Sequence, residues 1–221
     1  MLKKSSLSFL QHLKENNNRD WFQANKHLYA DAQEDFENLI TRLIPRINLF
    51  DATIGSLEAS DCIFRIYRDV RFSASKLPYK CHFGAYIAPS GRKSTLAGYY
   101  VHIEPQASYL SGGIYMASNP TMLRIRNEIA ALADEFLLIV EGDEFKAAFT
   151  SLGDESLKKV PKGFDPNSPV AEYLKLKHIT PYMSLSDEVV LSDEFEGRAT
   201  GAFKAMSPLV TFINEARYSI P

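Results

Sequence analysis

The sequence has 221 residues, of which 45% are hydrophobic and 24% are charged, and this composition excludes a disordered or fibrous chain. A formal net charge of −2 argues against a general nucleic-acid binder, and no apolar run approaches the roughly 20 residues that a membrane-spanning helix needs. The N-terminal segment is too polar for a signal peptide, so we expect a cytoplasmic protein with a single domain over residues 1–221. Cys62 and Cys81 form no CxxC pairing, and we expect two reduced thiols without a disulfide or zinc role.

The first part of the chain has the periodicity of helices. Leucines at every third position over residues 7–13 predict a short amphipathic helix, which the following Asn run ends. A pair of residues that resembles a capping box opens a second helix at Trp21. Apolar residues at helical spacing over residues 28–43 predict a longer third helix, which Pro45 ends or kinks.

The middle of the chain changes to the alternating period of β-strands. The turn around Gly91 favours a hairpin, and hairpins imply an antiparallel sheet. Gly112 and Gly113, inside a strand pattern, indicate a bulge or a close approach of another backbone. We predict a sheet of about four to five strands, over residues 62–72, 81–88, 95–104, 107–116 and 178–184.

The last part of the chain is largely helical. We predict helices over residues 119–136, 143–152, 169–176 and 192–216, the last of them broken at Pro208. Strands bracketed by helices, without regular βαβ alternation, predict an α+β fold. In this fold a small antiparallel sheet in the middle of the chain is packed by N-terminal and C-terminal helices on its apolar face.

Each of the first three predicted strands has one apolar face, which includes Arg68 in the first strand, and one face of charged, imidazole and phenol side chains. If the strands are neighbours, the second faces merge into one surface, formed by Arg65, Tyr67, Asp69, Arg71, Lys80, His82, Tyr86, Tyr100, His102 and Glu104. An antiparallel sheet often exposes a polar face to water, but Arg, Tyr and His join a flat apolar body to a polar tip, which favours a partly buried ligand site. Cross-strand pairing that only stabilises the sheet is the alternative.

The charge along this region favours an anionic ligand. Residues 64–93 hold seven Lys and Arg against one acid, so this window carries +6 and the rest of the chain −8. A guanidinium group binds carboxylate or phosphate through two hydrogen bonds, so we expect Arg65, Arg71 and Lys80 to hold the anion, with Lys76 closing over it.

Acid–base chemistry has its candidates on the same face. His82 and His102 titrate near neutrality, and Glu104 lies where it can orient an imidazole or act itself. Structural histidines are one alternative. Another is a metal ion on both histidines and Glu104 or Asp69, which the lack of HExxH or HxH spacing and the nearby cations disfavour. Neither a nucleophile nor a GxGxxG, GxxxxGK[ST] or GxSxG motif is identifiable, so the sequence names no cofactor and no reaction.

Five stretches of the sequence resemble the motifs of the domain of unknown function 2461 family. They are NNNRDWFQANKHLY at 16–29, IYRDVRFSASKLPYK at 66–80, GYYVHIEP at 98–105, GGIY at 112–115 and PKGF at 161–164. The resemblance spans nearly the whole chain and implies a soluble protein of one domain, without implying a substrate. The family-motif residues are Asn17, Arg19, Trp21, Asn25 and Lys26, then Tyr67 to Lys80, then Tyr100, His102 and Pro105.

The first of these motifs adds two cations. Arg19 and Lys26 lie near the start of a predicted helix, where unpaired backbone N–H groups favour anions. If this helix end leans over the polar face of the sheet, the first two motifs line one pocket. The alternative is that Asn17, Asp20 and Asn25 only cap helices.

We therefore expect a pocket for an anionic small molecule or phosphoester on the polar face of the sheet, where Tyr67 and Tyr100 orient the ligand. Hydrolysis or group transfer would be the accompanying chemistry, and the sequence leaves open whether the protein is an enzyme. The alternative is a non-catalytic module that docks nucleic acid or an acidic protein partner through a basic face.

Overall fold

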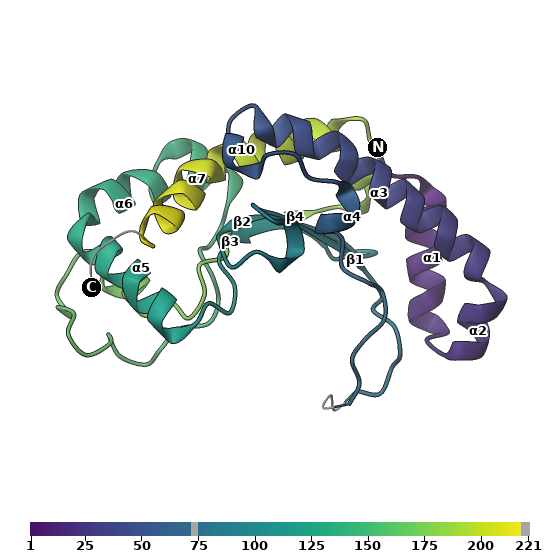
Figure 1. The fold of residues 1–221 in the computed structure, drawn as a ribbon, viewed down its shortest axis with the longest axis horizontal. Coiled ribbons are helices and arrows are strands. Elements are labelled where there is room, and N and C mark those ends of the chain that lie inside the picture. The colour runs from purple at the N-terminus through teal and green to yellow at the C-terminus, as the bar shows by residue number, and fades with distance from the viewer. Residues whose placement is uncertain (72–74, 218–221) are drawn as a thin grey trace.

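The chain folds as an α+β protein in the computed structural model, which describes residues 1–71 and 75–217 (Figure 1). Its strands are β1 (Phe83–Ile87), β2 (Gly98–Ile103), β3 (Ser108–Gly113) and β4 (Tyr182–Leu185). They form one antiparallel sheet in the order β1-β2-β3-β4, as the alternating sequence pattern predicts. The helices are α1 (Lys4–Glu15), α2 (Arg19–Ala24), α3 (Lys26–Asn48), η1 (Ala52–Ile54), α4 (Ala59–Cys62), η2 (Gly91–Lys93), α5 (Asn119–Ala131), α6 (Ala133–Val140), α7 (Asp143–Ala148), α8 (Ala171–Leu174), α9 (Asp187–Val190) and α10 (Glu194–Glu215).

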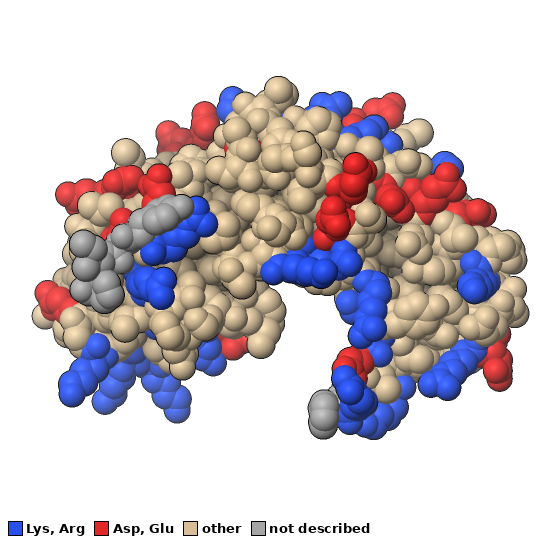
Figure 2. Space-filling model, in the orientation of Figure 1, with Lys and Arg blue, Asp and Glu red and all other residues tan. Residues whose placement is uncertain are grey.

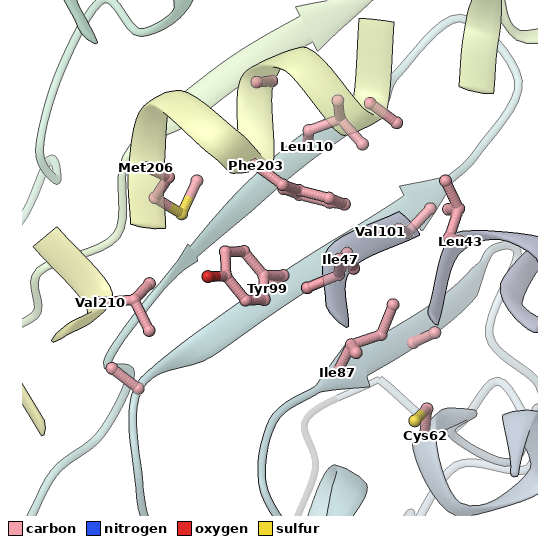
Figure 3. Packing of buried hydrophobic residues seen from close by; sticks show 14 of the residues in the cluster. Leu43, Ile47, Cys62, Ile87, Tyr99, Val101, Leu110, Phe203, Met206 and Val210 are labelled. Carbon is pink, nitrogen blue, oxygen red and sulfur yellow. The ribbon is translucent and has the colours of Figure 1, made fainter. Parts of the chain in front are cut away.

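Helices α3 and α10 cover one face of the sheet, and the core lies between them and the strands (Figure 1). The covered face is apolar because alternate residues of the strands, such as Tyr99 and Val101, point towards these helices (Figure 3). The Tyr99 ring lies 5.2 Å from the ring of Phe203 in α10, and its buried hydroxyl donates a hydrogen bond of 2.8 Å to Asp51. The predicted packing of N-terminal and C-terminal helices on the sheet is therefore confirmed.

The other face of the sheet looks into a hollow between two lobes. In Figure 1, α1 and α2 extend to one side of the sheet, and α5 and α6 extend to the other. Figure 2 shows the same hollow at the surface, so the molecule has the shape of an arch with the sheet at its centre. The helices bury one face only, and side chains of the other face meet in this concave space.

The predicted strand over residues 62–72 is wrong. Cys62 ends α4, and the segment meets the sheet at its start, where Ile63 forms an isolated bridge with Ala85 and the Phe64 amide donates 2.9 Å to the Gly84 carbonyl. Beyond this point the segment pairs with its own return, through bonds from Arg68 N to Pro78 O and from Lys80 N to Ile66 O. Proline has no N–H, so this pairing cannot extend as a regular ladder. We call residues 66–71 and 75–80 the arm; Phe72, the end of the predicted strand, lies outside the described residues.

Pro45 and Pro208 each lie inside a long helix. Pro45 does not end α3, which continues to Asn48, and α10 runs through Pro208. The helices continue because residues beyond each proline, such as Ile47 and Phe212, are buried in the core. Within the described part of the chain, the helices are all too short or too polar to cross a bilayer.

Gly112 lies where β3 meets α10, and it has room for hydrogen only. A Cβ atom at this position would lie 2.2 Å from Met206 Sδ and 2.5 Å from the Gly98 carbonyl oxygen. We expect Gly112→Ala to lower the free energy of unfolding by about 1–3 kcal/mol, because the added methyl group overpacks the contact. Chemical denaturation measures this loss. Gly197→Ala is the control: Gly197 has open space around it in α10, so alanine should leave stability equal or higher, and equal losses in the two variants would contradict the interpretation.

Glu196 joins α10 to α3 through ion pairs with Arg42 (2.7 Å) and Arg46 (3.4 Å). Burial would raise the pKa of Glu196, but the hydrogen bond and charge of Arg42 outweigh burial and hold the pKa below its ordinary value of 4.5. The stabilisation is therefore present above pH 4.5 and is lost as the pH falls through the pKa of the folded state.

We expect Glu196→Gln to cost about 1 kcal/mol of stability at neutral pH, and the difference from the unmodified protein to disappear at acid pH. Denaturation across pH 2–7 measures both quantities. Glu194→Gln is the control, because Glu194 is exposed and its ion pair with Arg198 is as long as 3.9 Å. A loss in Glu196→Gln that stayed constant down to the lowest pH would contradict the role of the carboxylate charge.

Candidate functional site

Alternate side chains of the four strands form a polar face towards the hollow. Its members are His82, Tyr86, Tyr100, His102, Glu104, Tyr109, Ser111 and Tyr182, placed by the strand registers. A row of rings crosses the sheet on this face, with centroid distances of 4.2 Å from His82 to His102, 4.4 Å from His102 to Tyr109 and 5.0 Å from Tyr109 to Tyr182. The row packs both imidazoles against neighbouring rings, so the polar face is not a loose solvated surface.

His82, His102 and Glu104 meet at one end of this row. The register sets Phe83 opposite Ile103, so one residue further along His82 faces Glu104. His102 Nε2 lies 3.2 Å from Glu104 Oε2, and Lys14 of α1 lies 3.4 Å from the other oxygen of Glu104. Burial and the neighbouring His102 lower the pKa of His82 to about 4, and burial also lowers the pKa of His102. Both imidazoles are therefore neutral near pH 7, beside a carboxylate.

Tyr100 orients His102 from the opposite side. Its hydroxyl lies 3.1 Å from His102 Nδ1, so the imidazole stands between a phenol and a carboxylate. The Tyr100 ring passes directly over Gly84, where a Cβ atom would come within 2.6 Å of the hydroxyl oxygen. Burial raises the pKa of Tyr100, so its hydroxyl keeps its proton at neutral pH.

A pocket opens where α2 meets the arm. The Asn17 side chain holds the two together, because it donates to the Tyr79 carbonyl (3.0 Å) and accepts from the Tyr79 amide (3.1 Å). The ring of Phe22 in α2 stacks on Tyr79 at 4.0 Å. The pocket has a volume of about 330 Å³ and is lined by Arg19, Gln23, Tyr67, Arg68, Val70, Pro78 and Tyr79. Residues of the first two sequence motifs therefore line one pocket, but its lining includes no residue of the strands, whereas the sequence placed the pocket on the polar face of the sheet.

Cations connect this pocket to the histidines. Burial lowers the pKa of Lys80, and the charges of Arg65 and Arg68 lower it further, so these three groups share one region. The charges of Lys80 and Arg68 also contribute to the low pKa of His82. Arg68 therefore lines the pocket and acts on the imidazole beside it. We call Arg19, Arg65, Arg68 and Lys80 the cationic cluster.

Other predicted site residues lie away from the polar face. Arg71 pairs with Asp69 at 2.7 Å in the arm, and Lys76 donates to the Val70 carbonyl at 3.0 Å. These three side chains are exposed, as is Lys26 at the start of α3. Arg65 belongs to the cationic cluster by its charge but lines a separate pocket of about 490 Å³, whose other cations are Arg92 and Lys93.

Arg68, Tyr109 and Lys14 are among the residues of the site that the sequence pattern missed. It assigned Arg68 to the apolar face of a strand, although an arginine among apolar residues was itself a signal that the segment leaves the sheet. Tyr109 follows from the alternation of β3, because it pairs with His102. Lys14 comes from a different element, and no pattern in the sequence connects it with Glu104.

Comparisons with known proteins identify the family. The family model described as conserved hypothetical protein (DUF2461) matches residues 5–212, so the chain belongs to this family. The curated proteins and the solved structures give no match. The family resemblance of the sequence motifs is therefore confirmed, and the chemistry of the site has to be inferred from its own geometry.

The contact between Tyr100 and His102 can be tested with two variants that break it in different ways. Gly84→Ala should push the Tyr100 hydroxyl aside at a cost of about 1–3 kcal/mol of stability, and Tyr100→Phe should remove the hydroxyl. Both should shift the His102 ring ¹⁵N resonances in the same direction in an NMR spectrum. Tyr86→Phe is the control, because the Tyr86 hydroxyl bonds the Leu96 and Gly113 carbonyls instead. Unchanged His102 resonances in the first two variants would show that Tyr100 does not orient the imidazole.

Proposed function

We propose that this protein binds an anionic small molecule or phosphoester in the pocket between α2 and the arm, beside the polar face of the sheet. The observation that carries the proposal is the Asn17 clamp, which brings Arg19 of the first motif to Arg68 and Tyr67 of the second. Two guanidinium groups with aromatic walls suit an anionic group such as phosphate or carboxylate, because each guanidinium can donate two hydrogen bonds to its oxygens. A volume of about 330 Å³ is in the range of small-molecule pockets.

The local charge supports an anion. Burial and nearby positive charge both act on Lys80, so ordinary solvent does not screen this cluster fully. In Figure 2, Lys and Arg side chains follow the wall of the hollow on the side of the arm. An anion in the pocket would offset the repulsion between Lys80 and the neighbouring arginines. The second pocket, around Arg65, also has cations, but Tyr29 is its one lining residue from the first motif, and its lining includes Glu37.

Docking of a nucleic acid or an acidic protein is the second candidate, since the arm projects from the body (Figure 1). The charges of the arm favour this second candidate less than they favour a small anion. Arg71 is paired with Asp69 in the arm, so it adds no net charge there. A polyanion would bind through many phosphate contacts, and its affinity would fall steeply with salt, whereas a single anionic group would show a shallow salt dependence.

Calorimetric titration with inorganic phosphate and with pyrophosphate, at constant ionic strength, tests the pocket. We expect binding that Arg19→Gln and Arg68→Gln each weaken about tenfold or more, because each removes a charge-assisted hydrogen bond. Lys158→Gln is the matched control: it removes the same charge from an exposed residue elsewhere and should leave affinity unchanged.

Asn17→Ala tests whether the position of the cations matters as well as their charge. It keeps every cation and removes the clamp, so it should weaken anion binding while the protein stays folded at the temperature of the measurement. Equal affinity in Arg68→Gln and Lys158→Gln, or no binding of either anion, would refute the proposal. A single-stranded oligonucleotide that binds with a steep salt dependence and loses affinity in Lys76→Gln would favour the second candidate.

A further inference from the structure

His82, His102 and Glu104 form a cluster with the ligand set of a metal site. One ligand atom from each residue lies within 4.8 Å of the other two. The strand register produces this arrangement, because it sets His82 opposite Glu104 and keeps His102 on the same face two residues before Glu104. The three residues are buried or partly buried at one end of the ring row, so their side chains have little freedom to separate.

The distances fit a small divalent ion. Ligand atoms at about 2.0–2.2 Å from a tetrahedral zinc ion lie about 3.3–3.5 Å from one another. His102 Nε2 and Glu104 Oε2 already lie 3.2 Å apart. The remaining separations, up to 4.8 Å, close with a modest rotation of the His82 ring, which belongs to a side chain just before β1.

Tyr100 holds the second ring nitrogen of His102, which orients the imidazole as a metal-binding histidine needs. Two tautomers satisfy the contacts of His102. In one, Tyr100 donates to Nδ1 and Nε2–H donates to Glu104. In the other, Nδ1–H donates to the Tyr100 oxygen, and the lone pair of Nε2 and the Glu104 carboxylate face each other across 3.2 Å. The second tautomer leaves the Nε2 lone pair available as a ligand, and a metal ion between these two acceptors would take the place of the proton.

We propose that His82, His102 and Glu104 bind one divalent first-row transition-metal ion. Two imidazoles and one carboxylate are ligands that zinc and its neighbours in this row accept, and hard ions such as Mg²⁺ prefer oxygen ligands only. Lys14 contacts Oε1 of Glu104, which leaves Oε2, the oxygen that faces His102, to ligate the ion. The inference is independent of the anion pocket and stands or fails on its own test.

The metal-free full-length protein, dialysed against a chelator and then against phosphate-free buffer, is titrated with Co²⁺ and with Zn²⁺. We expect one ion per chain, visible absorption bands from bound Co²⁺, and displacement of Co²⁺ by Zn²⁺. An equal concentration of Mg²⁺ should produce no displacement. His82→Gln and Glu104→Gln should each lower affinity at least tenfold, and Tyr100→Phe should lower it about tenfold because it removes the contact that orients His102.

His27→Gln is the matched control, because it removes an exposed histidine of α3 and should leave the titration unchanged. Circular dichroism verifies that each variant is folded, and the partly buried His82 keeps the test valid where a variant of the buried His102 fails to fold. Absence of the Co²⁺ bands, retention of them in both His82→Gln and Glu104→Gln, or their loss in His27→Gln would each overturn the proposal. Phosphate is absent throughout, so failure here leaves the anion titration unaffected, and the reverse also holds.

Discussion

The antiparallel register of β1 and β2 is the constraint on which the site depends. Side chains of a strand alternate between its faces, so a slip of one residue would turn His102 towards the core and Val101 towards the hollow. Tight packing prevents this slip. Val101 is fully buried under the helices, and Gly98 leaves no room for a side chain against Ala88 of the neighbouring segment. The apolar face therefore determines which residues meet on the polar face.

A second constraint acts from the N-terminal lobe. The polar face alone brings together imidazoles, phenols and one carboxylate, while the arginines of the pocket belong to α2 and the arm. A single amide side chain, Asn17, joins these parts by bonding both backbone groups of Tyr79. Because it also donates to the Cys81 sulfur at 3.2 Å, the clamp lies only one residue from His82. The position of the cations relative to the histidines thus depends on short-range hydrogen bonds and not on the sheet.

These two constraints explain what the sequence could and could not predict. Alternation predicted β1, β2 and β3 and placed Tyr100, His102 and Glu104 on one face, because burial of one face of a sheet leaves a period of two in the chain. The same rule failed for residues 62–72, which alternate but pair with their own return and leave the sheet after Phe64. It therefore misplaced Arg68 and grouped the exposed Arg71 with the site. Contacts such as Lys14 with Glu104 join residues far apart in the chain, and local periodicity carries no information about them.

The positive charges around the site repel one another while no ligand is bound. Glu104 is the carboxylate that contacts His102, and Lys14, Lys80 and Arg68 surround this region with positive charge. Bringing like charges together in a partly buried place costs free energy, and apolar residues at these positions would stabilise the fold more. A ligand of opposite charge recovers this cost on binding. A metal ion on His82, His102 and Glu104 would add positive charge to this region, and an anion held by Arg68 beside it would offset that charge, so the two proposals are complementary.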